Sequence, residues 1–213
     1  MHKEVLICID RDGTLIYDDK YYLGRTNDWK SKIKILPKVI AGLKLLQSQL
    51  PDSKIFMITN QPGIAIKEFP LLTKKRDREV NQYLLNLFSK KGIIFDGFFF
   101  SPFASKEYAL KHSQYHFKPK YTKDSQLTKP NPGMVFQALK ASKFLKKLTN
   151  IYVIGDRKLD GLTGLNAKAT GIVIPFKNTL DKSIFEEARK HKNFIIKKDF
   201  VQAAKFIISR EKD

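Results

Sequence analysis

Acidic side chains stand directly after two apolar runs, where paired carboxylates could act on a phosphate ester. Asp10 and Asp12 follow the apolar residues 5–9, and Asp156 follows the apolar residues 151–154. A carboxylate can attack phosphorus and hold the phosphoryl group as an aspartyl phosphate, which replaces one hard displacement by two easier ones. A second carboxylate two residues on can protonate the leaving oxygen and later deprotonate the attacking water. Asp10 is therefore the candidate nucleophile, and Asp12 is the candidate general acid and base.

Cationic and hydroxyl groups complete this candidate chemistry. The carboxylate and the phosphate are both anionic, so a cation must lie between them, and Asp10 and Asp156 offer the hard oxygen ligands that Mg²⁺ binds. Thr59 follows a second apolar run at residues 54–58, and Lys129 precedes the helix that leads to residues 151–154. The Thr59 hydroxyl and the Lys129 ammonium would stabilise the transferring phosphoryl oxygens.

The elements that must position these residues alternate between strand-like and helix-like patterns. This order is typical of a mostly parallel sheet with helices on both faces, and ligands of such sheets bind beyond the carboxyl ends of the strands. We expect an α/β fold, a Rossmann-like three-layer α/β/α sandwich, in a single domain over residues 1–213. Strands are expected at 5–9, 54–58, 98–100, 151–154, 170–174 and 194–196, and helices from Pro37 and at 73–91, 132–145, 160–168, 183–191 and 200–209.

Two irregular segments interrupt this alternation. Residues 17–34 are charged and aromatic without a clear period, and we interpret them as a flap-like loop. Residues 102–128 are long, basic and irregular, and loops of that length are usually functional or disordered. We interpret them as a substrate-specificity loop.

The composition bounds the setting of the protein. The chain has 213 residues, of which 42% are hydrophobic, as in a soluble globular domain. No apolar run approaches the roughly 20 residues that span a bilayer, and the N-terminus lacks a signal pattern. The single cysteine, Cys8, excludes an internal disulfide. We expect a cytoplasmic monomer without membrane contact.

The net charge of +19 admits three interpretations. A basic surface can bind nucleic acid or steer small phosphorylated substrates into a site. It can also reflect codon bias, because 33 of the basic residues are lysines and only 7 are arginines. Lysine is the weaker choice for planar bidentate contacts with phosphates or bases, and these lysines are spread along the whole chain. Codon bias is the favoured interpretation.

Four strings in this order resemble the motifs of the haloacid dehalogenase superfamily. They are Asp-Arg-Asp-Gly-Thr (10–14), Thr-Asn (59–60), Lys129, and Gly-Asp followed by Asp160 (155–160). By this resemblance Asp10 is the nucleophile, Asp12 the general acid and base, and Thr59 and Lys129 hold the phosphoryl group. An aspartate at position 12 is typical of the phosphatases of the superfamily. The implied Mg²⁺ ligands are the side chains of Asp10 and Asp156 and the backbone carbonyl of Asp12, with Asp160 in a supporting position.

The finer strings resemble one branch, the D-glycero-D-manno-heptose 1,7-bisphosphate 7-phosphatases, and their relatives, the histidinol-phosphate phosphatases. The strings are Thr-Asn-Gln-Pro-Gly-Ile (59–64) and Lys-Pro-Asn-Pro-Gly-Met (129–134). The resemblance implies an enzyme without a large cap domain that acts on a small phosphorylated substrate, such as a sugar phosphate. It also implies substrate contacts from Asn60 and Arg157.

The chain departs from that branch in its third loop. Those families carry a zinc clamp there, made by a Cys-x-His pair and a Cys-x-Cys pair. We predict no structural zinc, because none of the residues at the matching positions is a zinc ligand. The arginine that usually precedes the motif lysine is also replaced, by Thr128. The residues at the zinc positions are Ser101, Phe103, Ser125 and Leu127.

Three alternatives to a sugar phosphatase stay open, and a histidinol-phosphate phosphatase is the first of them. Polynucleotide 3′-phosphatases belong to the same superfamily, and the lysines and aromatic residues of 102–128 would suit single-stranded nucleic acid. The string at 129–134 favours the sugar branch over this alternative. The third alternative is a catalytically silent protein that binds phosphate or nucleic acid on the same fold.

Overall fold

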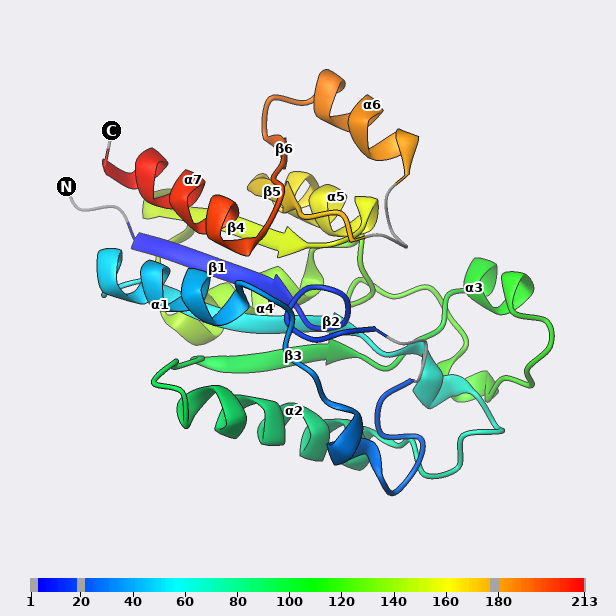
Figure 1. Ribbon diagram of the computed structural model, residues 1–213. Helices are drawn as coiled ribbons and strands as arrows, with labels where there is room; N and C mark the ends of the chain where they lie inside the picture. Colours follow the sequence, from blue (N-terminus) through cyan, green and yellow to red (C-terminus); the bar gives the residue numbers. More distant parts are fainter. Residues whose placement is uncertain (1–3, 19–21, 177–180, 213) are drawn as a thin grey trace.

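A parallel six-stranded sheet forms the centre of the computed structural model, which describes residues 4–18, 22–176 and 181–212. The strands lie in the order β3-β2-β1-β4-β5-β6, and every neighbouring pair is parallel. This arrangement confirms the predicted α/β fold (Figure 1). The strands are β1 (Glu4–Asp10), β2 (Lys54–Asn60), β3 (Gly97–Ser101), β4 (Thr149–Gly155), β5 (Thr170–Val173) and β6 (Phe194–Ile196).

Helices cover both faces of the sheet, as the three-layer prediction requires. The helices α1 (Val39–Gln49), α2 (Lys74–Ser89) and α7 (Phe200–Lys212) pack on one face. On the other face lie α4 (Gly133–Ser142) and α5 (Lys158–Asn166), with α6 (Lys182–Lys190) beside α5 and β6. Within the described ranges, no helix combines the length and the apolar character that crossing a bilayer requires.

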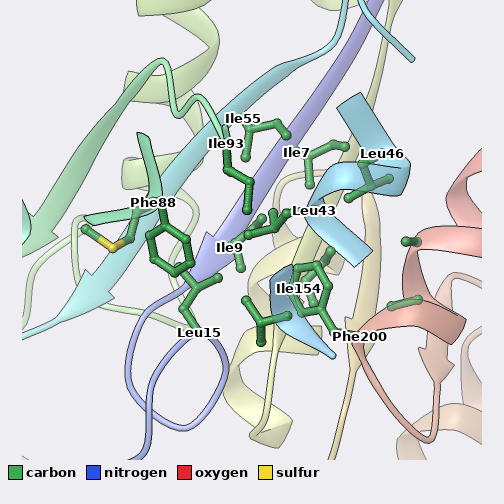
Figure 2. Packing of buried hydrophobic residues seen from close by; sticks show 14 of the residues in the cluster. Ile7, Ile9, Leu15, Leu43, Leu46, Ile55, Phe88, Ile93, Ile154 and Phe200 are labelled. Atoms are coloured by element: carbon green, nitrogen blue, oxygen red, sulfur yellow. The ribbon is translucent and has the colours of Figure 1, made fainter. Parts of the chain in front are cut away.

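The continuous apolar run of β1 is explained by burial on both faces. Ile7 and Ile9 point toward α1, as Figure 2 shows, whereas Leu6 and Cys8 point toward α4, and all four are fully buried. A central parallel strand reads as a continuous hydrophobic run for this reason. Burying each such leucine or isoleucine contributes roughly 1.5–3 kcal/mol, so this strand is a rigid base for the residues at its end.

One predicted boundary is wrong, because the first helix begins at Val39 and not at Pro37. Lys38 lies between them with a left-handed backbone (φ 66°), which helical geometry does not allow. Its ammonium instead donates to the Asp199 carboxylate at 2.7 Å, just before α7. The remaining predicted helices and strands are present, with ends that shift by a few residues.

The two irregular segments lie at the carboxyl edge of the sheet. In the flap-like loop, residues 19–21 lie outside the described residues, and an antiparallel bridge between Ile16 and Ile35 closes the rest. The specificity loop contains a short helix, α3 (Lys106–Lys111), that was not predicted. Figure 1 shows α3 beyond the ends of the strands. Bridges from Ile66 to Phe117 and from Ala104 to Thr122 hold this loop.

Candidate active site

The strand register brings the predicted site residues to one rim. Asp10, the last residue of β1, pairs with Ile58, which directly precedes Thr59. On the other side Ile9 pairs with Ile154, so Asp156 follows two residues beyond that pair. The carboxyl ends of β1, β2 and β4 therefore present these side chains to the same side of the sheet.

Lys129 connects two carboxylates at this rim. Its buried ammonium donates to Asp10 Oδ1 and, at 2.5 Å, to Asp160 Oδ1. Burial alone would lower the pKa of Lys129, but the two carboxylates raise this pKa above its ordinary value. Both amide atoms of Asn60 bond the Lys129 backbone, at 2.9 and 3.1 Å. Asn60, which is predicted to contact substrate, thus also holds the Lys129 backbone in place.

Asp10, Asp156 and Asp160 form a buried acidic cluster, with one ligand oxygen of each within 4.8 Å of the others. Burial and the neighbouring carboxylates raise the pKa of Asp10 well above its usual range, against the opposing effect of Lys129. Burial and the Asp160 charge raise the pKa of Asp156 to about 7. Crowded carboxylates of this kind are stabilised by a cation between them.

The geometry around Asp156 fits a small divalent cation. Among the described residues none donates a hydrogen bond to its buried Oδ2, and the ion-pair partner of this oxygen is Arg157 Nε at 3.8 Å. Gly13 passes so close that a Cβ there would lie 2.5 Å from this oxygen, and its φ of +83° also requires glycine. An all-oxygen donor set with an unsatisfied carboxylate oxygen is the chemistry that Mg²⁺ binds.

The cluster includes Asp160, which is predicted to support the Mg²⁺ ligands. Asp160 lies beside the two carboxylates that are predicted to bind the metal. The reason is its position in the first turn of α5, where its other oxygen accepts the Arg157 backbone N–H at 3.0 Å. The Asp12 carboxylate is not part of the group, which leaves the backbone carbonyl as its predicted contact with Mg²⁺.

The Asp12 carboxylate is held on the β2 side of the site. Gln61 Nε2 donates to Asp12 Oδ2 at 2.8 Å, and the Thr59 hydroxyl donates to the same oxygen at 3.3 Å. Arg11 Nε donates to Asp12 Oδ1 and Oδ2 at 3.0 and 3.1 Å. The side chain of Asp12 is 24% exposed, so the carboxylate stays open to a substrate.

The predicted substrate contact Arg157 lies at the rim. Its side chain is half-exposed, and its Nη2 donates to Asp18 at 2.7 Å. A hydrogen bond between the Ser101 and Thr128 hydroxyls, at 2.6 Å, joins the start and the end of the specificity loop, in which no structural zinc is predicted. The apolar side chains of Phe103 and Leu127 line a groove nearby.

Sequence reasoning missed four polar residues that support the site from behind. Arg11 is fully buried and pairs with Asp77 and Asn81 of α2, and Gln61 joins Thr59 to Asp12. A signal was present, because Asp77 and Asn81 share the helical face of the apolar Val80. Polar residues on a buried face need partners, and Arg11 is that partner.

Sequence comparison finds two kinds of similar proteins, the HisB proteins and the heptose bisphosphate phosphatases. The histidine biosynthesis bifunctional protein HisB of Legionella pneumophila is 30% identical over 189 residues, which cover 87% of this chain and 46% of HisB. The chain thus spans about half the length of such relatives. The D-glycero-beta-D-manno-heptose-1,7-bisphosphate 7-phosphatase of Helicobacter pylori is 29% identical over 186 residues, 84% of this chain and 88% of that enzyme. No protein-family model matches the sequence.

Solved structures share the fold. The D,D-heptose 1,7-bisphosphate phosphatase of B. bronchiseptica, complexed with magnesium and phosphate, superposes with a TM-score of 0.68 at 17% identity, over 96% of this chain and 98% of that one. A putative HAD-like phosphatase of Mesorhizobium loti gives a TM-score of 0.62 at 24% identity, over 81% and 72%.

Fold and sequence similarity together show that the chain resembles phosphatases of the haloacid dehalogenase superfamily. Within that class it resembles the D-glycero-D-manno-heptose 1,7-bisphosphate 7-phosphatases and the HisB proteins.

Proposed function

We propose that this protein is a magnesium-dependent phosphomonoester hydrolase that works through an aspartyl phosphate on Asp10. The observation that carries the proposal is the environment of the Asp10 carboxylate. One of its oxygens accepts from the buried Lys129 ammonium, and two further carboxylates lie within 4.8 Å in the same cluster. This arrangement combines a nucleophile, a fixed cation for the phosphoryl oxygens and a site for a divalent metal.

In the first step a carboxylate oxygen of Asp10 attacks phosphorus, and the bond from phosphorus to the ester oxygen breaks. Asp12 gives its proton to that leaving oxygen, so an alcohol departs and Asp10 carries the phosphoryl group. Lys129 stabilises the charge on the phosphoryl oxygens, because its ammonium is already fixed beside Asp10.

In the second step Asp12, now a carboxylate, takes a proton from water as that water attacks phosphorus. The bond from phosphorus to Asp10 breaks, inorganic phosphate leaves, and the Asp10 carboxylate is regenerated. Asp10, Asp156, Asp160 and the Asp12 carbonyl would hold Mg²⁺, which when bound offsets the negative charge between the carboxylates and the phosphate.

The proposed substrate is a phosphorylated sugar such as D-glycero-D-manno-heptose 1,7-bisphosphate. The support is the Helicobacter pylori relative, an enzyme of that name that aligns over most of its length. The heptose bisphosphate phosphatase of B. bronchiseptica, which has a similar fold, was solved in complex with magnesium and phosphate, and this agrees with the proposed metal.

The test is phosphate release, with and without Mg²⁺, from heptose bisphosphate, histidinol phosphate and a 3′-phosphorylated oligonucleotide. We expect Mg²⁺-dependent turnover that is fastest for heptose bisphosphate and is abolished by Asp10→Asn with the fold intact. Near-normal activity of folded Asp10→Asn would refute the nucleophile, and Mg²⁺-independent turnover would refute the metal requirement.

A second candidate, polynucleotide 3′-phosphatase, is favoured by one specific feature. A groove of about 420 Å³ runs along the open edge of β3. Lys74 lies 6.0 Å from the Phe103 ring, and Arg78 lies 6.0 Å from the Phe100 ring. Alternating cations and aromatic rings can hold single-stranded nucleic acid. Oligonucleotide turnover that exceeds sugar turnover and falls steeply with salt would establish this candidate instead.

A further inference from the structure

Arg11, between the two motif aspartates, is completely buried. Arginine is almost never buried to this extent unless it is paired. One edge of its guanidinium faces Asp12, with Nε at 3.0 and 3.1 Å from the two carboxylate oxygens. The terminal Nη2 lies 2.9 Å from Asp12 Oδ2 as an ion pair, at an angle that forms no hydrogen bond. The buried Arg11 guanidinium therefore contacts the Asp12 carboxylate side-on, through its Nε and Nη2 atoms.

The other end of the guanidinium is anchored on α2. Arg11 Nη1 donates to Asp77 Oδ1 at 3.0 Å and to Asn81 Oδ1 at 2.7 Å. Asn81 Nδ2 donates in turn to Asp77 Oδ2 at 2.9 Å, so the three side chains form a closed network. Asp77 and Asn81 are both fully buried and stand one helical turn apart.

This network ties the orientation of Asp12 to a helix that contributes none of the motif residues. Because a guanidinium is rigid and planar, fixing Nη1 on α2 also fixes the Nε edge that meets Asp12. Buried charge-assisted hydrogen bonds have few alternative partners, so the arrangement is well determined.

We propose that Arg11 is a positioning residue for Asp12, and that Asp77 and Asn81 set the position of Arg11. The role rests on the proposed function, since it concerns the group that protonates the leaving oxygen. A general acid must lie within hydrogen-bond reach of that oxygen, and small misplacements cost rate.

The experiment compares kcat/KM for phenyl phosphate and p-nitrophenyl phosphate in the wild type and Arg11→Lys. This constant covers the steps up to phosphoryl transfer, in which Asp12 is the acid. p-Nitrophenolate leaves without a proton, whereas phenolate needs one, so a misplaced acid slows phenyl phosphate more. We expect Arg11→Lys to widen the ratio of the two constants about tenfold, because one ammonium cannot bridge Asp12 and α2.

Asn81→Ala provides a second variant, because it removes one contact of Arg11 and leaves the contact with Asp12. We expect the ratio to widen in the same direction but by less, about threefold. If Arg11→Lys does not fold, Asn81→Ala decides the question alone. Gln82→Ala is the matched control, since Gln82 is an exposed neighbour that bonds only Asn86 among the described contacts. The ratio should not change in this control.

Two outcomes separate the proposed function from this role. Normal wild-type turnover with equal losses for both esters, or with no loss in the folded variants, overturns the positioning role alone. No phosphate release by the wild type, or undiminished release by Asp10→Asn, overturns the proposed function and this role with it.

Discussion

Asp156 carries the least satisfied oxygen among the residues proposed to bind Mg²⁺. Its Oδ2 is buried, accepts no hydrogen bond from any residue that the structure describes, and lies near the Asp160 charge. A buried charge without a full set of partners lowers the stability of the metal-free protein. The same oxygen becomes favourable when a divalent cation contacts it. Asp156 thus lowers the stability of the metal-free protein and raises its affinity for the metal.

Asp156→Asn should therefore separate stability from metal binding. We expect the free energy of unfolding without metal to stay equal or rise by about 1 kcal/mol, since a neutral amide relieves the crowding. Bound Mg²⁺ should raise the melting temperature of the wild type, because a ligand that binds only the native state stabilises it. The variant should lose most of that rise. Thermal unfolding with and without MgCl₂ measures both quantities, and a full metal-induced rise in the variant would contradict the proposed ligand.

At the scale of single residues, the sequence predicts which side chains meet at the site. It predicts less well which of them form hydrogen bonds with one another. Asp10, Thr59 and Asp156 are predictable because each stands at the end of an apolar strand. The setting of Asp12 is not, because it depends on the burial of Arg11 against α2. Asp77 and Asn81 lie 66 and 70 residues from Arg11 in the chain, so no local sequence pattern predicts that they pair with it.

At the scale of elements, an aromatic cluster holds the specificity loop, in which no structural zinc is predicted. Phe69 is buried, and its ring lies 5.3 Å from the Tyr115 ring and 4.9 Å from the Tyr22 ring. Aromatic pairs at these separations add about 0.5–1.5 kcal/mol beyond their buried area. Backbone bonds from Lys118 to Ala65 and from Lys67 to His116 support the same contact.

Phe69→Ala should loosen residues 102–128 before the rest of the protein. A buried Phe→Ala change costs about 3–5 kcal/mol, and the loss falls on the contact that holds the loop. We expect faster tryptic cleavage at the loop lysines, with slower change in the sheet. Phe136→Ala is the control, since Phe136 is 39% exposed on α4. Unchanged cleavage in Phe69→Ala, or protection of the wild type by added zinc, would show that the cluster does not hold the loop.

The start of α7 gives a test with a pH signature. Asp199 Oδ1 accepts the Gln202 backbone N–H at 2.9 Å, and Oδ2 accepts from Lys38. The Lys38 hydrogen bond and the helix cap lower the pKa of Asp199. A carboxyl with a lowered pKa stabilises the native state above its unfolded pKa of about 3.9, and this stabilisation is lost as pH falls below it.

Asp199→Ala should therefore cost about 1 kcal/mol at neutral pH, the usual value of an N-cap. The difference from the wild type should shrink as the pH falls below about 4. Asp199→Asn, which keeps a capping oxygen without the charge, should lose less stability and show no such pH dependence. Urea unfolding at several pH values measures the free energy of unfolding of all three proteins. If the wild type and Asp199→Ala differ by the same free energy down to acid pH, the charge of Asp199 does not contribute to stability.

At the scale of the whole molecule, the alternation of strands and helices predicts the layers, because a parallel sheet must be covered on both faces. It does not predict the groove along β3. That groove forms where the edge strand meets α2 and the loop that follows it, and both contacts depend on tertiary packing. Charge is likewise a property of the whole chain: the formal value of +19 does not say where an anion binds.

The salt dependence of turnover tests whether this charge serves the site. A small dianionic substrate is steered by the overall field, so its kcat/KM should fall only a few-fold between about 0.01 and 0.1 M salt, as the screening length shortens from about 30 to 10 Å. kcat should not change, because the bound complex is already formed. Lys74→Ser in the groove should behave like Lys44→Ser, a change of an exposed lysine on α1. A larger effect of Lys74→Ser, confined to a 3′-phosphorylated oligonucleotide and steep in salt, would instead assign the groove to nucleic acid, because each neutralised phosphate adds to the salt slope.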